Sequence, residues 1–164
     1  MEQMIKQLKE VSEMQKALDE RILKEKGIVK YPLENMKIAL FVELGELMNE
    51  LPTKFKHWKS SAADNHEKAV EEYVDCLHFA ISIFNYRFYG TEASHEILES
   101  CCKDFYEVHP KLPISVIVEY ILSSGCELSY LFILGRTLCF TWKEIYEAYK
   151  KKNEVNYQRL KSGY

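Results

Sequence analysis

Apolar residues recur along most of the chain at alternating intervals of three and four positions, which places them on one face of an α-helix. The first such run consists of Met4, Leu8, Val11, Leu18 and Ile22. Alternation of single apolar and polar residues, which is typical of half-buried strands, nowhere extends beyond a few positions. The pattern therefore predicts an all-α protein, a helical bundle of about six helices.

Glycines, prolines and capping residues mark where these helices begin and end. Gly27 ends the first helix, Pro32 opens the second, and Pro52 stops it. The remaining predicted boundaries are a third helix capped by Asp64 or Asn65, a short fourth helix capped by Thr91, a break at residues 109–113, a fifth helix over about 114–135, and a sixth that starts with a capping box at Thr141 and Glu144.

Two acidic pairs interrupt the apolar faces of the second and third helices. Glu43 and Glu46 form a Glu-x-x-Glu pair, and Glu72 and Asp75 form a Glu-x-x-Asp pair. Residues three apart share a helical face, and the first pair falls inside the apolar sector rather than opposite it. Buried carboxylates repel one another unless they are paired or bound to metal. Two pairs of hard ligands on two helices therefore predict a Mg²⁺ site in a four-helix core.

Two other interpretations of these acids compete with the Mg²⁺ site. A solvated acidic face with surface ion pairs suits Glu50 and Glu71 but not Glu43 and Glu46, which lie among leucines. A di-iron carboxylate bundle requires a Glu-x-x-His motif from each of two helices. No such motif occurs among these acids, so the Mg²⁺ site is favoured.

Gln15 occupies a position of the first apolar run where another apolar residue is expected. An amide at such a position is either a core polar group with satisfied hydrogen bonds or a group that recognises a bound molecule, and spacing alone does not decide between them. On the third helix, His78 is expected to point away from the acidic face, as a packed or surface histidine.

Residues 53–59 join the two acidic helices and combine lysines, among them Lys56, with Phe55 and Trp58. Lysines offer cations for phosphates, and aromatic rings offer a flat surface for a base. The alternative is a basic linker whose tryptophan caps the core. Both interpretations stay open on the sequence alone.

The C-terminal segment is basic and contains polar residues at helical spacing. Lys152, Asn156 and Arg159 recur on one helical face and are suitable phosphate ligands. A basic helix end also complements the helix dipole, which explains the lysines. It does not explain the asparagines, which are poor helix formers.

Length and charge narrow the functional classes. At 164 residues, the chain is predicted to be one domain covering residues 1–164, with a substantial core. A net charge of −3 argues against direct nucleic-acid binding, which needs a basic face. The charged start does not resemble a signal peptide, and the odd count of five cysteines suits a cytoplasmic location. Charges and serines interrupt the most apolar run, residues 116–135, so no membrane span is expected.

Four blocks of the chain together resemble the dimeric all-α dUTPases of the MazG-like nucleotide pyrophosphatase superfamily. They are residues 15–19, residues 43–46 running into 55–59, residues 72–79, and residues 152–164. The two acidic motifs are similar to those of the whole superfamily. The block around Gln15, the block around Trp58 and the terminal Gly-Tyr resemble the dUTPase branch more narrowly. Leu160 departs from that pattern, because a glutamine is expected after Arg159.

This resemblance implies a role for each matching site residue. The implied ligands of two or more Mg²⁺ ions, with Mn²⁺ as a substitute, are Glu43, Glu46, Glu72 and Asp75. The implied uracil contacts are Gln15 and Trp58, and Phe79 resembles a residue that packs near the sugar. The implied phosphate-binding residues are Lys56, Lys152, Asn156, Arg159 and Tyr164.

The implied activity is Mg²⁺-dependent hydrolysis of dUTP to dUMP and pyrophosphate, which keeps uracil out of DNA. The resemblance implies attack at the β-phosphorus and makes dUDP a further candidate substrate. A pyrophosphatase of broader specificity, acting on dCTP and dUTP or of the house-cleaning type, would share every metal ligand and differ only in its base pocket. A non-enzymatic alternative is a helical interaction module bound by a repressor; some phage-borne relatives of the family serve both roles.

A homodimer is the expected assembly. The resemblance implies it, and so does the apolar stretch over residues 116–135. Its small residues Ser123, Ser124 and Gly125 suit a close helix contact across a subunit boundary.

Overall fold

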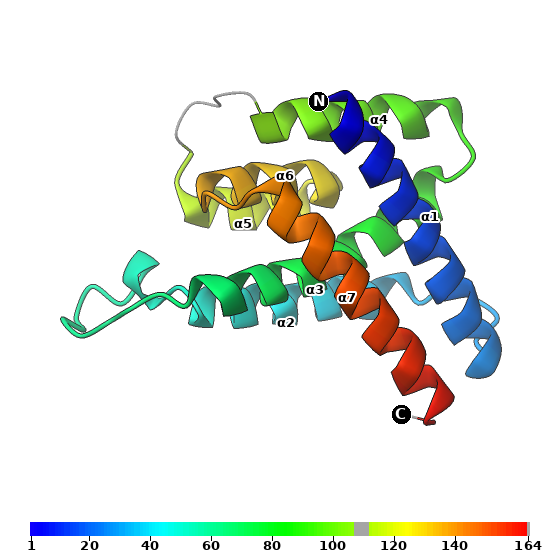
Figure 1. The fold of residues 1–164 in the computed structure, drawn as a ribbon, viewed down its shortest axis with the longest axis horizontal. Coiled ribbons are helices and arrows are strands. Elements are labelled where there is room, and N and C mark those ends of the chain that lie inside the picture. The colour runs from blue at the N-terminus through cyan, green and yellow to red at the C-terminus, as the bar shows by residue number, and fades with distance from the viewer. Residues whose placement is uncertain (107–111, 164) are drawn as a thin grey trace.

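The computed structural model describes residues 1–106 and 112–163, and these residues form helices joined by loops and turns (Figure 1). The α-helices are α1 (Glu2–Glu25), α2 (Leu33–Asn49), α3 (His66–Phe88), α4 (Glu92–Tyr106), α5 (Ile114–Ser123), α6 (Glu127–Thr137) and α7 (Trp142–Lys161), and η1 (Pro52–Lys54) is a short 3₁₀ turn. The described residues contain no strand. The all-α prediction is confirmed.

The predicted fifth helix over residues 114–135 is wrong in one respect, because it is two helices. Gly125, between α5 and α6, has φ of +75°, a left-handed conformation that glycine adopts without strain. Arg87 holds this turn by donating to the Gly125 carbonyl at 2.8 Å and to both carboxylate oxygens of Glu127 at 2.6 and 3.0 Å. Of the small residues expected at a subunit contact, Ser123 is the last residue of α5, and Ser124 and Gly125 lie in the turn that follows.

Two of the predicted caps are present where the site-bearing helices start. Asn65 caps α3 by accepting from the Lys68 amide. Asp64 instead closes the preceding loop, since its carboxylate accepts from the Thr53 amide at 2.9 Å. Thr141 begins α7 with a complete capping box, in which Glu144 accepts from the Thr141 amide at 2.8 Å. These caps set the registers of α3 and α7.

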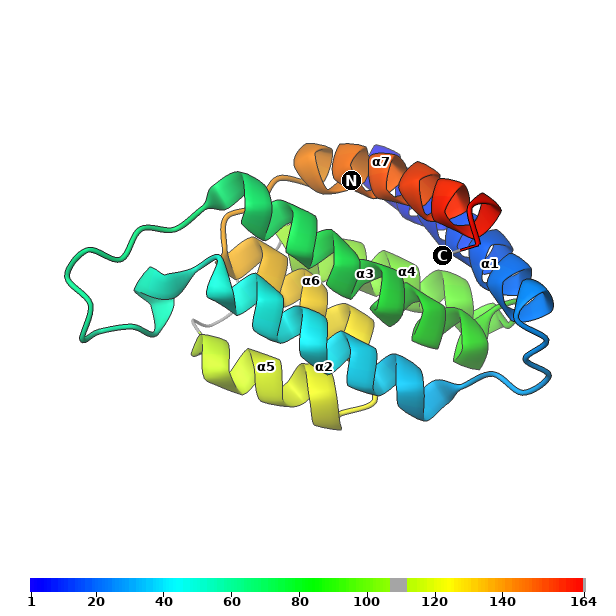
Figure 2. The same ribbon diagram turned by 90° about the horizontal axis from the view of Figure 1, so that it is seen from below.

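Helix α3 runs through the middle of the molecule and contacts α1, α2, α6 and α7. Figure 2 shows α2 lying along α3 on one side, with α1 and α7 together on another. Helix α6 packs against α4 and α5, and these three helices contact the group through α3, α1 and α2 respectively. The set α1, α2, α3 and α7 is thus a four-helix group, and it carries the candidate site.

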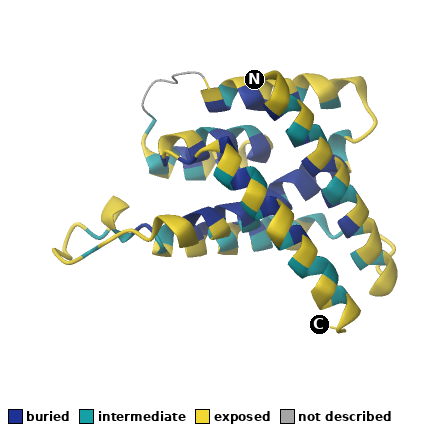
Figure 3. Cartoon of the chain, viewed as in Figure 1, coloured by how far each residue is buried: buried dark blue, intermediate teal, exposed yellow. Residues whose placement is uncertain are grey.

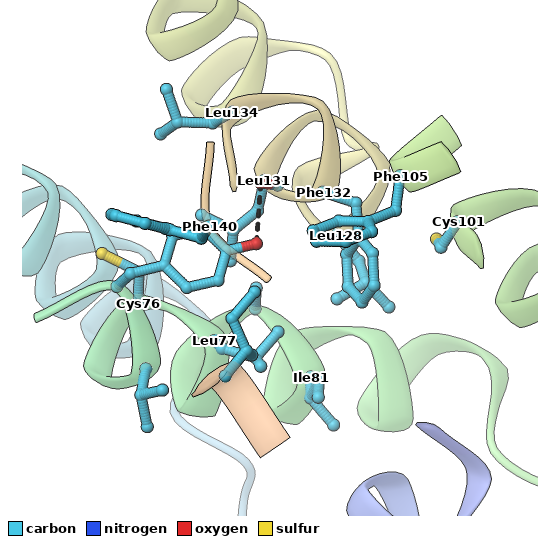
Figure 4. Close-up of a cluster of buried hydrophobic side chains, with 14 of the residues drawn as sticks. Cys76, Leu77, Ile81, Cys101, Phe105, Leu128, Leu131, Phe132, Leu134 and Phe140 are labelled. Carbon is cyan, nitrogen blue, oxygen red and sulfur yellow. Dashed lines mark hydrogen bonds between the residues drawn. The ribbon is translucent and has the colours of Figure 1, made fainter. Parts of the chain in front are cut away.

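Buried side chains follow α3 and the helices around it (Figure 3). Tyr73 of α3 is fully buried, and its hydroxyl donates to the Leu131 carbonyl at 2.9 Å (Figure 4). A Cβ added at Gly135 would lie 2.6 Å from that hydroxyl oxygen, so only glycine allows α6 to approach so closely. This contact fixes the rear of α3, opposite the face that bears the acids.

The loop over residues 50–65 projects beyond the ends of α2 and α3 (Figures 1 and 2). Among the helices of the described residues, none combines the length and apolar character needed to cross a bilayer.

Candidate active site

Carboxylates from α2 and α3 converge where these two helices face each other. Glu43, Glu46 and Glu72 each offer a carboxylate oxygen, and these oxygens lie within 4.8 Å of one another. The i, i+3 spacing within α2 and the pairing of α2 with α3 are enough to produce the cluster. The structure thus brings together three of the four acids that the sequence singles out.

The carboxylates of this cluster carry like charges at short distance and repel one another. The pKa of Glu43 is raised to about 7, first by its partial burial and then by the charges of Asp75, Glu46 and Glu72. The pKa of Glu72 is also raised, for the same kinds of reason. A bound cation would relieve this repulsion, and carboxylate oxygens are the ligands that hard divalent cations prefer. The cluster fits a divalent metal site.

Asp75, the fourth acid, forms an ion pair with α7. The Lys152 ammonium lies 2.5 Å from one oxygen of its carboxylate. Burial raises the pKa of Asp75, while Lys152 and then Arg159 act to lower it. The basic C-terminal helix therefore faces the acids directly, as its helical pattern of lysine, asparagine and arginine suggests.

A cavity of about 280 Å³ lies one turn further along α3 and α7, and is closed on its other side by α1. Phe79, Asn156 and Arg159 line it together with Gln15. Several residues that the resemblance assigns to substrate therefore share one cavity, although they come from three helices. Its size is at the lower end of small-molecule sites, and it adjoins the pair formed by Asp75 and Lys152.

The Gln15 amide in this cavity is held by three hydrogen bonds. Its Oε1 accepts from the Tyr149 hydroxyl at 2.7 Å and from His78 Nδ1 at 2.6 Å. Its Nε2 donates to Asp19 Oδ1 at 2.8 Å. The sequence left open whether Gln15 is a satisfied core group or contacts a ligand, and the structure shows features of both. Its carbonyl is satisfied internally, while the side chain still lines the cavity.

A second set of hydrogen bonds supports Asp19. Ser82 bonds to its carboxylate, and the Tyr31 hydroxyl lies 2.6 Å from the Ser82 oxygen. Burial raises the pKa of Asp19 to about 6, against the lowering effect of the bonds from Ser82 and Gln15. The result is a continuous chain from Tyr31 through Ser82 and Asp19 to Gln15.

His78 and Tyr149 are functional candidates that the sequence did not reveal. His78 was expected to point away as a packed or surface residue; it is packed, but against Gln15 and stacked on Tyr149 with ring centroids 4.2 Å apart. Burial lowers the pKa of His78 to about 3, so its ring is neutral. The only available signal was that Tyr149 precedes Lys152 by one turn and so shares its approximate face.

Two other predicted substrate residues, Trp58 and Lys56, are not part of this arrangement. Trp58 is 68% exposed and packs edge-on against Phe55 and His57 in the projecting loop. Lys56 lies in the same loop, with its ammonium over the Phe55 ring. Both belong to the loop that leads into the start of α3 (Figure 1), whereas the cavity is lined by His78, Phe79 and Ser82 further along that helix. Tyr164 lies outside the described residues.

Fold and site together define a class of protein: an all-α bundle in which paired carboxylates of two helices face a basic third helix beside a small cavity. A family model described as dUTPase matches residues 7–164. The chain therefore belongs to the all-α dUTPase family, and its enzymatic activity is that of a dUTP diphosphatase. A comparison with curated protein sequences gives no match.

Proposed function

We propose that this protein hydrolyses dUTP to dUMP and pyrophosphate, with Mg²⁺ held by Glu43, Glu46, Glu72 and Asp75. The observation that carries the proposal is the adjacency of two parts along α3 and α7. The carboxylates and Lys152 lie one helical turn from the cavity lined by Gln15, Phe79 and Asn156. This order matches a nucleotide with its base in the cavity and its phosphates at the acids.

The acids are the group of the chain best suited to Mg²⁺. They supply only oxygen ligands, and the pKa of Glu43 is raised first by burial and then by repulsion from Asp75, Glu46 and Glu72, which a divalent cation would relieve. When bound, Mg²⁺ neutralises phosphate charge and lowers the pKa of a water molecule that attacks the phosphoanhydride.

Lys152 and Arg159 bind the phosphates in this proposal and stabilise the charge that develops on the leaving group. Lys152 is paired with Asp75. A divalent cation bound to Asp75 would neutralise its carboxylate in place of Lys152. The Lys152 ammonium would then be available to bind a phosphate oxygen. The tail residues thus act on the substrate from α7, opposite the metal ligands of α2 and α3.

We also propose a homodimer formed through the outer face of α2. Ile38, Phe41 and Val42 lie on this face with 63%, 62% and 48% of their surfaces exposed. Exposed apolar side chains clustered in this way commonly mark an interface. Phe41→Glu should yield a monomer by light scattering, whereas Lys37→Glu on the same helix should not. A wild-type monomer at micromolar concentration would overturn the proposal.

Base stacking by Trp58 stays a prediction that depends on assembly. Within one chain the loop over residues 50–65 projects beyond the ends of α2 and α3 (Figure 1), whereas the cavity is lined by residues of α1, α3 and α7. Trp58 would therefore stack on a base only from a second copy or after a large loop movement. The five cysteines are free, which suits a reducing compartment such as the cytoplasm.

The test of the proposed activity is a pyrophosphate-release assay across dUTP, dCTP, dTTP and dATP with Mg²⁺, with dUDP as an additional substrate. We expect dUTP to be hydrolysed much faster than the other triphosphates, with dUMP and pyrophosphate as products. Comparable rates for all four would instead identify a pyrophosphatase of broad specificity. Release of single phosphate from dUTP would contradict the proposed bond cleavage, whereas dUDP cleaved at the same bond yields dUMP and single phosphate.

A further inference from the structure

The hydrogen bonds around Gln15 occupy its amide oxygen and leave one N–H hydrogen available to a ligand. An amide carbonyl oxygen has two lone pairs, and Oε1 already accepts from Tyr149 at 2.7 Å and from His78 at 2.6 Å. Nε2 has two hydrogens, one of which goes to Asp19. No residue within the described ranges accepts the second hydrogen. Gln15, which lines the 280 Å³ cavity, can therefore donate there but not accept.

The surrounding groups determine this orientation of the amide. A flipped amide would place Oε1 against the Asp19 carboxylate, which can only accept when ionised, and would place the NH₂ group against Tyr149 and His78. Ser82 and Tyr31 hold Asp19 from its other side. Because Gln15 Oε1 only accepts, His78 Nδ1 must carry the hydrogen. The imidazole is thus the Nδ1–H tautomer, and it donates to Gln15.

We propose that Tyr149 and His78 are positioning residues. They hold Gln15 so that its amide contacts the base only as a hydrogen-bond donor, to the O4 carbonyl of uracil. This inference rests on the proposed function. Uracil presents a carbonyl at position 4, and cytosine presents an amine there. If the base is cytosine, the Gln15 N–H faces the cytosine amine. Two buried donors then face each other without an acceptor, which is costly. The positioned Gln15 donor therefore discriminates between dUTP and dCTP.

The Gln15 donor does not discriminate against thymine. Thymine carries the same two carbonyls as uracil, so a donor at Gln15 accepts it equally well. Exclusion of dTTP must depend on how the cavity wall meets the 5-methyl group. Weakening the hold on Gln15 should therefore change discrimination against dCTP and leave discrimination against dTTP as it was.

Tyr149→Phe tests the proposal with little change in shape, because it removes only the hydroxyl that donates to Gln15. The measured quantities are kcat and KM for dUTP, dCTP and dTTP with Mg²⁺. We expect the dUTP to dCTP ratio of kcat/KM to fall by roughly 3- to 10-fold, the size of one net hydrogen bond, mainly through KM. The dUTP to dTTP ratio should stay constant.

The matched control is Tyr146→Phe, on the same helix one turn earlier, whose hydroxyl donates to the exposed Glu10. It should leave all three substrates unaffected. For His78, Asn can present an amide N–H near the position of Nδ1, so His78→Asn should retain more of the dCTP discrimination than His78→Leu. Thermal melts of each variant show whether a change reflects loss of folding.

The outcomes separate this inference from the proposed function. A wild-type protein that does not prefer dUTP would overturn the proposed function itself. Preference for dUTP in the wild type, with an unchanged dUTP to dCTP ratio in folded Tyr149→Phe, would overturn only the donor-only assignment. A parallel fall in both ratios would also overturn it, because it would show a general loosening of the cavity.

Discussion

The acid cluster and the Gln15 cavity lie side by side but are built in opposite ways. At the cluster, carboxylates of Glu43, Glu46 and Glu72 lie close together, and burial and neighbouring negative charges raise the pKa of Glu43 and of Glu72. In the cavity, Gln15 Oε1 accepts from Tyr149 and His78 and Gln15 Nε2 donates to Asp19, so most of the hydrogen-bonding capacity of this amide is met within the fold. One region is prepared for an added cation, and the other is already organised.

This difference suggests a division of labour. A bound divalent cation relieves the carboxylate repulsion, so the cluster is suited to the chemical step. A satisfied network resists rearrangement and presents a fixed pattern of donors, so the cavity is suited to recognition. The two regions should therefore respond differently to substitution, pH and metal.

The largest expected effect is at the cluster. Glu46→Gln should lower kcat by more than about 100-fold, the upper range seen when only a supporting neighbour of a metal ligand is lost. The dUTP preference of any residual activity should persist. Glu34→Gln, at the exposed start of the same helix, is the control. Near-normal kcat in Glu46→Gln would remove this residue from the metal site.

A smaller effect is expected in the cavity. Gln15→Ala removes the donor and leaves Tyr149, His78 and Asp19 without their shared partner. The dUTP to dCTP ratio of kcat/KM should fall by about 10-fold or more, since a lost buried hydrogen bond also leaves its partners unpaired. The kcat for dUTP should change much less than in Glu46→Gln. An equal loss of kcat in both variants would break the proposed division of labour.

The smallest effect is on stability without metal. The pKa of Glu43 in the folded protein, about 7, lies above its usual value of 4.5. The stability linked to this raised pKa is therefore fully present below pH 4.5 and is lost as the pH rises through 7. In EDTA, the melting temperature should fall from pH 5 to pH 8 by roughly 2–4 °C on this account, after allowance for solvent screening.

Glu43→Gln should flatten this pH dependence, and Mg²⁺ should raise the melting temperature of the wild type more at pH 8 than at pH 5. The measurement is differential scanning fluorimetry across pH with and without Mg²⁺. An unchanged pH slope in Glu43→Gln would show that this carboxylate does not experience the repulsion described above.

The sequence predicted the helices and the acidic pair of each helix because these depend on local spacing; the cluster then follows from the pairing of α2 with α3. Helical periodicity, Asn65 and the Thr141 capping box are visible within a few residues, and so is the i, i+3 pairing of Glu43 with Glu46. The break at Gly125 was missed, since an apolar run gives no sign of a left-handed residue held by Arg87 from another helix.

The organisation of the cavity could not be predicted in this way. The bonds that join Gln15 to His78 and Tyr149 span 63 and 134 positions of sequence, so no local pattern reports them. Gln15 itself was noticed only because it interrupts an apolar run. The sequence suggested that its amide could pair with uracil at two places; the tertiary contacts occupy its carbonyl and leave only the donor.

The most direct test of the division of labour is calorimetric binding of dUMP and dCMP to Glu46→Gln in EDTA. If the cavity alone recognises the base, the variant should bind dUMP more tightly than dCMP by the same factor as the metal-free wild type, although it does not turn over dUTP. Loss of that preference in Glu46→Gln, with the fold intact, would contradict the account, because recognition would then depend on the acids.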